Sequence, residues 1–465
     1  QMCIRDRRKS IEETMKELDL TQGSVPKVLL QFAVPFLIAN VLQALYGGAD
    51  LFVVGQYDDS ASVAAVAIGS QVMQTITGII LGITTGTTVL IAIATGAKDN
   101  RKVAFTIGSS VWLFSITGVV LTLVMVLFHS RIAELMHTPV EAMVDTKNYI
   151  LVCSLGILFI VGYNVVCGIL RGLGDSKTPL YFVGLACVIN IVLDFILVGY
   201  FHWGATGAAI ATVTAQGVSF GIALWFLYRH GFHFDFSRKD IRLNRNLSKK
   251  ILVLGAPIAL QDALINVSFL IITVIVNQMG VIASASLGVV EKIIVFAMLP
   301  PMAISSAVAT MTAQNYGAGL IKRMNKCLAS GIGIALVFGV SVCVYSQFLP
   351  ETLTAFFTKD AAVVAMAADY LRGYSIDCIV VSFVFCINSY FSGQGNSLFP
   401  MIHSLIATFL FRIPLSYWFS QIDSSSLFIM GFAPPISTVV SLLICIWYLR
   451  YTQRKLYLRG TMMPA

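Results

Sequence analysis

One short motif occurs twice in this chain, and the spacing of its copies constrains the fold more than any other feature. The segment Gly172-Leu-Gly-Asp-Ser-Lys-Thr-Pro179 returns as Gly393-Gln-Gly-Asn-Ser-Leu-Phe-Pro400, 221 residues later. Further landmarks keep nearly the same offset: Gly96-Ala97 with Gly317-Ala318, Pro35 with Pro257, and Tyr149 with Tyr370. A shared register over this distance predicts two copies of one structural unit.

The amino-acid composition indicates whether these two units fold in water or in a membrane. Hydrophobic residues make up 57% of the 465 residues and charged residues 12%, whereas a soluble domain carries about 25% charge. Apolar runs long enough to cross a bilayer recur along the whole chain. We therefore predict an all-α polytopic membrane protein with twelve transmembrane helices in two six-helix bundles related by the repeat, which excludes soluble enzyme classes. The expected spans are 28–55, 64–94, 103–128, 140–170, 178–201, 205–228, 250–279, 284–314, 325–349, 361–391, 398–420 and 425–450.

These spans define the expected domains. Residues 15–228 form an N-lobe, 229–249 a cytoplasmic linker, and 250–465 a C-lobe with a cytoplasmic tail. Residues 1–14 fit neither lobe and lack the apolar core of a signal peptide, so we interpret them as a non-native or disordered leader, with a natural start at Met15.

Basic residues occupy alternate loops, which predicts the orientation. The positive-inside rule places the basic set, both termini and the linker in the cytoplasm. The net charge of +8 therefore reflects membrane topology, and no nucleic-acid partner is expected. The basic set is Lys98, Arg101, Lys102, Arg171, Lys177, Lys322, Arg323, Lys326 and the segments 229–250 and 450–459. The opposite loops carry Asp58, Asp59, Arg131, Lys147 and Lys359.

Two carboxyl groups lie inside spans of the first half. Burying an ionisable group in a span costs about 2.5–3.5 kcal/mol, so such groups are candidates for function. Asp50 and Asp194 lie near the outer ends of the first and fifth spans, each about 8–9 Å below the outer surface at the rise of a helix. At one depth, the two carboxyl groups can share a cavity. A carboxyl group tuned toward neutral pH can load and release a proton.

Neutral polar residues accompany the two aspartates. Helical spacing places Gln43 and Tyr46 on the face of Asp50, and Asn190 on the face of Asp194. Thr212, Asn164 and Tyr149 add polar groups from neighbouring spans. We predict a cation-coupling site here, with Asp50, Asn190, Asp194 and Thr212 as the possible sodium ligands and no other metal or cofactor. The alternative is a hydrogen-bonded knot that only joins helices.

The second half does not repeat this cluster, because Phe411 and Leu415 stand at the places of Asn190 and Asp194. Candidates for substrate binding there are Asp377, Asp262, Asn266 and Gln261, and from the first half Tyr46. For Lys292 and Arg412 we expect structural salt bridges, with Glu291 or an aspartate as the partner. Pro35 allows a kink in the first span, either a bend governed by Asp50 or a static one.

The chain resembles the multidrug and toxic compound extrusion (MATE) transporters over roughly residues 20–455. The resemblance rests on the motifs Ala33-Val-Pro35, Gln43, Asp50-Leu-Phe-Val-Val-Gly55, Arg171-Gly-Leu-Gly-Asp175 with Pro179, Asn190-Ile-Val-Leu-Asp194, Gly207-Ala-Ala-Ile-Ala-Thr212, Ala313-Gln-Asn-Tyr-Gly-Ala318 and Arg412-Ile-Pro-Leu415.

The resemblance implies two six-helix bundles around a central cleft, and efflux driven by inward movement of protons or sodium. It also implies an N-half cation site at the seven polar positions from Gln43 to Thr212 and bending at Pro35. Asp377 looks like the span-10 aspartate of NorM-type members, but Ile265 stands at their span-7 glutamate position. The sequence as a whole resembles the MepA-like and DinF-like bacterial groups of this family more than the NorM-type members.

The main hypothesis is therefore a secondary antiporter in a bacterial inner membrane, acting as a monomer, that exports amphipathic or cationic drugs in exchange for protons or sodium. A lipid-linked precursor flippase of the same superfamily is the alternative, because Lys292 and Arg412 suit an anionic pyrophosphate. A membrane enzyme lacks a nucleophile or HExxH motif, and a primary pump lacks a GxxxxGK[ST] loop.

Overall fold

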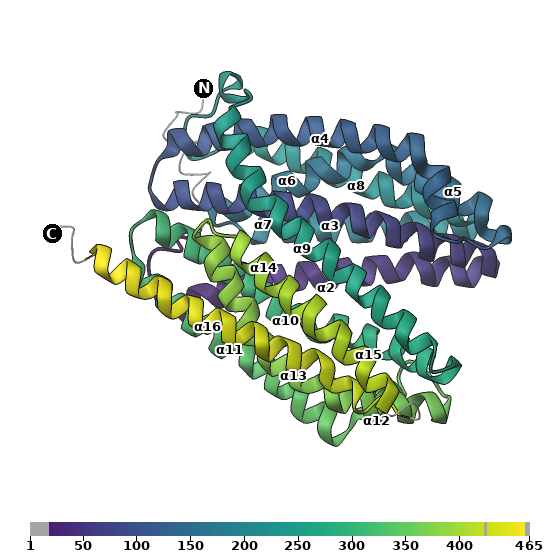
Figure 1. Ribbon diagram of the computed structural model, residues 1–465. Helices are drawn as coiled ribbons and strands as arrows, with labels where there is room; N and C mark the ends of the chain where they lie inside the picture. The colour runs from purple at the N-terminus through teal and green to yellow at the C-terminus, as the bar shows by residue number, and fades with distance from the viewer. Residues whose placement is uncertain (1–17, 423–425, 461–465) are drawn as a thin grey trace. The chain divides into compact units, whose positions relative to one another are not determined.

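The computed structural model describes residues 18–422 and 426–460, and within them it is helical and contains no strand. The expected leader, residues 1–14, lies outside the described part of the chain. Figure 1 shows the long helices within each half running side by side. The helices up to residue 230 are α2 (Val25–Tyr57), α3 (Ser60–Gly96), α4 (Asn100–Leu135), α5 (Met143–Leu155), α6 (Ile157–Leu173), α7 (Lys177–Asp194) and α8 (Gly204–His230). The later helices are α9 (Arg245–Asn277), α10 (Val281–Gly317), α11 (Ile321–Phe348), α12 (Pro350–Thr354), α13 (Ala361–Gly393), α14 (Leu398–Ile406), α15 (Ile413–Ile422) and α16 (Ala433–Gly460).

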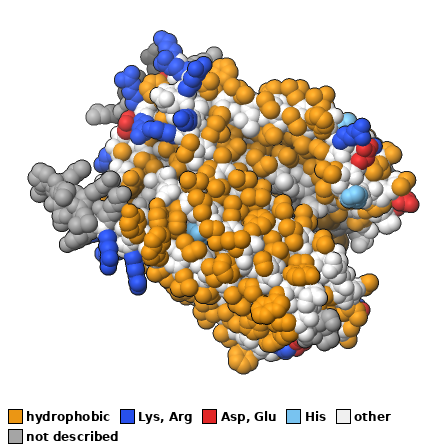
Figure 2. Space-filling view, in the orientation of Figure 1, with side chains coloured by type: hydrophobic (Ala, Val, Ile, Leu, Met, Phe, Trp, Pro, Cys, Tyr) orange, Lys and Arg blue, Asp and Glu red, His pale blue; other side chains and the backbone are white. Residues whose placement is uncertain are grey.

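Within the described ranges, eleven helices or helix runs are long and apolar enough to cross a membrane, and a bent pair supplies the twelfth. This confirms the predicted all-helical fold with twelve spans. Large apolar side chains such as Leu127 and Phe356 are exposed, and Figure 2 shows hydrophobic side chains covering much of the visible surface. Lipid, being as apolar as these side chains, is the solvent that suits such a surface.

The fourth span differs from the single helix expected over 140–170. It begins with a short 3₁₀ turn, η1 (Val140–Ala142), and then consists of α5 and α6, which meet at 49°. Gly156 stands at the break. A Cβ at this position would lie 2.5 Å from Cγ2 of Val213 on α8, so the close approach of α8 requires a residue without a side chain. The sequence shows Gly156, but it does not show how closely α8 approaches at this position.

Two spans contain a wide helical turn that was not predicted. The π-helical turn η2 (Phe195–Tyr200) follows Asp194 directly, and a second, η4 (Ala407–Arg412), joins α14 to α15 and ends at Arg412. Pro414 lies just beyond η4, and its missing N–H and its ring disturb the preceding helical turn. Such turns are frequent at functional sites, and both adjoin an ionisable residue inside a span.

The chain forms two compact units whose borders lie inside helices. The first unit contains the segment ending at Gly23, then Gln31–Ala259 and Ala313–Leu320. The second contains Ser24–Leu30, Leu260–Thr312 and the chain from Ile321 onward. Helices α2, α9 and α10 therefore each contribute to both units, and the start of α9 packs with the first.

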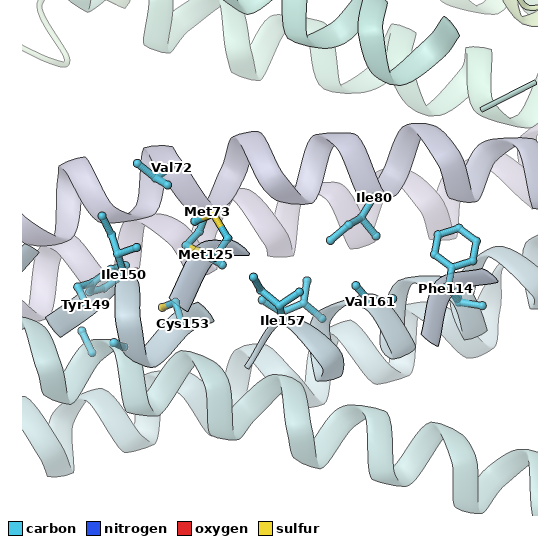
Figure 3. Packing of buried hydrophobic residues seen from close by; sticks show 14 of the residues in the cluster. Val72, Met73, Ile80, Phe114, Met125, Tyr149, Ile150, Cys153, Ile157 and Val161 are labelled. Carbon is cyan, nitrogen blue, oxygen red and sulfur yellow. The ribbon is translucent and has the colours of Figure 1, made fainter. Parts of the chain in front are cut away.

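The core of the first unit lies between α3, α4, α5 and α6 (Figure 3). Phe114 and Ile150 are among its fully buried side chains, and Figure 3 shows Met73 and Met125 near Ile150, with Phe114 towards the other end of the cluster. Burying a large apolar side chain within a soluble fold stabilises it by about 1.5–3 kcal/mol, but lipid removes much of this gain, so close packing matters more here. This core holds α5, with Tyr149 and Cys153, in a fixed place.

Candidate functional site

Three helices bring the carboxyl groups of the first unit together. Asp50 lies seven residues before the end of α2, Asp194 is the last residue of α7, and Thr212 lies on α8. Ser219 Oγ on α8 donates to the Phe182 carbonyl of α7 at 3.1 Å, which fastens these two helices side by side. The helix ends and their packing thus place side chains that are 162 residues apart in sequence against one another.

The contacts at this cluster link four polar residues. Thr212 Oγ1 donates to Asp50 Oδ2 at 3.1 Å, and Asn190 Nδ2 lies 3.5 Å from Thr212 Oγ1. Asp194 interacts electrostatically with Asp50. Asp50 is 4% exposed, and Asn190 and Asp194 are fully buried. The structure therefore gathers Asp50, Asn190, Asp194 and Thr212 in one place.

Among the described residues, no basic side chain neutralises this cluster, which we call the carboxyl pair. Among the described residues, no Lys, Arg or His forms an ion pair with Asp50 or Asp194. Asp50 Oδ1, Asn190 Oδ1 and both Asp194 oxygens also lack a hydrogen-bond donor within that part of the chain. Neighbouring carboxylates repel each other, and buried polar atoms without partners are costly. These oxygens can hold a proton or a hard cation such as sodium.

Two tyrosines flank the carboxyl pair. Tyr46 and Tyr149 each interact electrostatically with Asp50, and Tyr149 is 2% exposed. The Tyr46 hydroxyl lies near Thr212 and Gln216, although it makes no well-aligned hydrogen bond within the described chain. Gln216 was not among the predicted site residues. Its position four residues after Thr212, on the same face of α8, is the signal that could have identified it.

Two predicted members are not joined to the carboxyl pair by hydrogen bonds between described residues. Asn164 is buried, but its Nδ2 donates to the Ile160 carbonyl of its own helix at 2.7 Å. Gln43 is exposed and makes no hydrogen bond to any described residue. Its spacing placed it on the Asp50 face of α2, but a helix face two turns away need not meet the same neighbours. Within the described residues, neither side chain forms a hydrogen bond with the cluster.

Pro35 lies inside α2, which continues as one helix from Val25 to Tyr57. The border between the two units crosses α2 between Leu30 and Gln31, just before this proline. Pro257 holds the matching place in α9, where the border falls after Ala259. A proline removes one backbone hydrogen bond, so each helix is weakened near the point where it changes unit. Bending at Pro35 stays a prediction.

In the second unit, the Asp377 carboxyl has a cationic partner. Asp377 is fully buried on α13, and Arg412 Nη2 lies 3.7 Å from its Oδ2. The Arg412 guanidinium also lies over the Phe269 ring, 5.4 Å from its centroid. The salt bridge expected for Arg412 is therefore present, with an aspartate as its partner. This partner reduces the negative charge that Asp377 can offer to a substrate or ion.

The other candidates of the second unit form no hydrogen bond or ion pair with Asp377 within the described residues. Asp262 and Asn266 are exposed on α9, so they differ from Asp377 in burial. Gln261 Nε2 donates to Ser404 Oγ at 3.3 Å. Glu291 accepts a hydrogen bond from Thr273 Oγ1 at 3.4 Å and interacts electrostatically with Lys292. A substrate-binding role for Asp262, Asn266, Gln261 and Asp377 stays a prediction.

A buried histidine network in the second unit was missed. His403 is fully buried, and its ring nitrogens lie 2.8 Å from Ser441 Oγ and 2.8 Å from Asn388 Oδ1. The signal for it in the sequence is a histidine inside the expected span 398–420. The network ties α14 to α13 and α16, which suits a structural role.

Removing Arg412 is expected to destabilise the second unit, because Asp377 would be left buried without a cation. Breaking a buried ion pair from one side costs about 3–5 kcal/mol. We expect Arg412→Leu to lower the thermal unfolding midpoint of the protein in detergent. The double variant Asp377→Asn with Arg412→Leu removes both charges and should recover most of that loss. An unfolding midpoint for Arg412→Leu equal to the unmodified protein would contradict this.

Comparison with known proteins identifies the family. The model of the MatE family matches twice, over residues 35–196 and 257–418, in agreement with the internal repeat. The chain is 29% identical to "Probable multidrug resistance protein YpnP" of Bacillus subtilis, over 87% of this chain and 91% of that protein. It is 27% identical to "Probable multidrug resistance protein NorM" of Thermotoga maritima, over 86% and 87% of the two chains. It is 26% identical to "Multidrug export protein MepA" of Staphylococcus aureus, over 81% and 83%.

Solved structures share the fold. A crystal structure of MATE in complex with MaL6 matches with a TM-score of 0.89 at 23% identity, covering 95% of this chain and 99% of that one. A crystal structure of MATE in the straight conformation matches with a TM-score of 0.88 at 24% identity, with the same coverage. The chain therefore belongs to the MatE family, a family of membrane transporters and not of enzymes.

Proposed function

We propose that this protein exports amphipathic or cationic compounds in exchange for protons or sodium, and that the exchange is coupled at the carboxyl pair of the first unit. The observation that carries the coupling site is the pair itself: Asp50 and Asp194 interact inside the bundle without a cationic partner among the described residues. The drug specificity is supported by relatives named as multidrug resistance or multidrug export proteins.

The chemistry of the pair fits alternating access. An incoming proton or sodium ion neutralises part of the charge of Asp50 and Asp194, while Asn190 and Thr212 supply neutral oxygens. A cation stabilises the conformation in which these oxygens are close together, and its release removes that stabilisation. A ligand shifts an equilibrium only through such a difference in affinity between conformations. Drug export then follows when drug and ion favour different conformations.

The remaining features of the proposal follow the charge pattern of the sequence. We place both termini and the linker of residues 229–249 on the cytoplasmic side of a bacterial inner membrane, and we expect the protein to act as a monomer. Asp262, Asn266 and Gln261 on α9, with Asp377 and Tyr46, are the candidates for contact with the drug. Their acidic groups favour a positively charged compound, and apolar walls accept varied shapes.

Transport in proteoliposomes tests the proposal. Protein reconstituted with ethidium as the cationic probe is given either a proton gradient or a sodium gradient. We expect one of the two gradients to drive ethidium against its concentration, and dissipating that gradient with an ionophore to stop it. Ethidium movement that neither gradient accelerates would contradict coupled export.

The same proteoliposomes distinguish drug export from the flippase alternative. It needs a cationic cavity for a pyrophosphate group, but Arg412 is engaged by Asp377 and Phe269, and Lys292 remains the candidate. We expect no translocation of a lipid-linked pyrophosphate precursor. Translocation of that lipid together with absent ethidium transport would replace drug export by the flippase function.

A further inference from the structure

The segment between α8 and α9 is fastened along α4 in the first unit. The indole Nε1 of Trp112 on α4 donates to the Ile241 carbonyl at 3.0 Å. A Cβ at Gly108 would lie 1.9 Å from the Asp240 carbonyl oxygen, so the backbones touch where α4 lacks a side chain. Two contacts one helical turn apart thus hold residues 240 and 241 against α4, and they set the direction of the residues that follow.

This arrangement brings two arginines to one aromatic ring. The guanidinium carbons of Arg101 on α4 and Arg242 on the docked segment each lie 5.6 Å from the centroid of the Phe105 ring. Both arginines are exposed. A ring can orient a guanidinium by cation–π attraction, which contributes about 0.5–1 kcal/mol at an exposed site. The guanidinium groups of two arginines that are 141 residues apart in the sequence therefore lie at the same ring.

One acidic group lies close to the two arginines. The Asp240 carboxylate accepts hydrogen bonds from the Ser237 backbone N–H at 2.8 Å and from Ser237 Oγ at 3.0 Å, and these bonds lower the pKa of Asp240. The carboxylate is thus engaged by its own turn. It forms no ion pair with Arg101 or Arg242 within the described residues, so both guanidinium groups keep donors free of an acidic partner.

Exposed apolar side chains flank the arginines. Ile241 and Leu243 alternate with Arg242, and Trp112 is exposed beside them. Figure 2 shows Lys and Arg side chains gathered over the start of α4 and the segment before α9. Apolar and aromatic side chains interleaved with basic ones suit the boundary between acyl chains and headgroups. Each basic residue near an anionic membrane surface contributes about 1 kcal/mol.

We propose that this surface, the linker patch of Arg101, Phe105, Trp112, Ile241, Arg242 and Leu243, binds the headgroup of an anionic phospholipid. The two guanidinium groups bind the phosphate, and the three exposed apolar side chains contact the acyl chains. The patch lies apart from the carboxyl pair and is independent of the transported compound. Lipid bound here fastens the segment between α8 and α9 to the membrane surface as well as to α4.

Lipid binding to the purified protein tests the linker patch. Native mass spectrometry compares the binding of phosphatidylglycerol with that of phosphatidylcholine of the same acyl chains. The double variant Arg101→Gln with Arg242→Gln removes both guanidinium groups. We expect it to weaken phosphatidylglycerol binding at least tenfold, as the loss of about 1 kcal/mol per basic residue implies. Binding of phosphatidylcholine should not change.

A matched control removes the same charge elsewhere. Lys322→Gln with Lys326→Gln deletes two exposed basic side chains from the first turns of α11. We expect this variant to bind phosphatidylglycerol as the unmodified protein does. Equal weakening by both double variants would overturn the site in favour of general charge attraction. Displacement of phosphatidylglycerol by excess inorganic phosphate would overturn the lipid as its ligand.

Discussion

Asp50→Asn is expected to abolish ion-driven ethidium export while the protein folds and inserts normally. The asparagine amide is the size of the carboxyl group, and its oxygen can still accept the hydrogen bond that Thr212 Oγ1 gives to Asp50 at 3.1 Å. The variant thus keeps the packing but removes the negative charge that binds a cation. We expect gradient-driven export in proteoliposomes to fall to the level of protein-free vesicles, a loss far beyond tenfold, since the step that links ion to drug is removed.

A matched carboxyl-to-amide change controls for this experiment. Asp58 follows the end of α2 and is exposed, so Asp58→Asn alters the same chemical group outside the carboxyl pair. It should transport at the rate of the unmodified protein. Thr212→Ala removes the hydrogen bond but keeps both carboxyl groups, and it should slow coupled export without stopping it. Normal export by Asp50→Asn would refute coupling at this site.

Gly96→Val is expected to force the ends of α3 and α10 apart and to destabilise the first unit. A Cβ at Gly96, at the end of α3, would lie 1.8 Å from the Gln314 carbonyl oxygen of α10, which belongs to the same compact unit. The repeat supplies the reciprocal contact, because a Cβ at Gly317 would lie 1.9 Å from the Ile93 carbonyl oxygen. Both obstacles are backbone atoms, so the helix ends must separate. Overpacking of this kind costs about 1–3 kcal/mol and can cost more.

Thermal unfolding in detergent measures this effect, and α3 offers its own control. A Cβ at Gly78 meets no atom within 4 Å, so Gly78→Val adds the same side chain to the same helix in open space. We expect Gly96→Val to lower the unfolding midpoint clearly and Gly78→Val to leave it nearly unchanged. Similar midpoints for the two variants would show that the ends of α3 and α10 do not pack as closely as described.

The sequence predicted the fold well, because its two strongest signals are physical constraints. An apolar run of span length must be a helix in lipid, where backbone groups have no other hydrogen-bond partners. The repeat then required two similar halves, and the family match over residues 35–196 and 257–418 agrees. The break at Gly156 and the wide turn after Asp194 escaped prediction, since both depend on neighbouring helices.

The candidate site was predicted in part. Spacing along a helix found Asn190 with Asp194, and the assigned depth of the spans brought Asp50 to them. Spacing failed for Gln43, because a shared helix face does not ensure a shared neighbour. The ion pair of Asp377 with Arg412 was foreseen only as one of several pairings, because sequence gives no distance between helices. This ion pair is nevertheless a chemical difference between the halves, because the described part of the chain gives Asp50 and Asp194 no such basic partner.

The central claim is that ion coupling lies at the carboxyl pair, whose two acids have no basic partner in the described part of the chain, and not at Asp377, which pairs with Arg412. The most direct measurement is the movement of protons or sodium ions that ethidium elicits in proteoliposomes. We compare Asp50→Asn with the charge-neutral double variant Asp377→Asn with Arg412→Leu. The account predicts no ethidium-linked ion movement in Asp50→Asn and retained ion movement in the double variant. Retained ion movement in Asp50→Asn, together with its loss in the double variant, would contradict it.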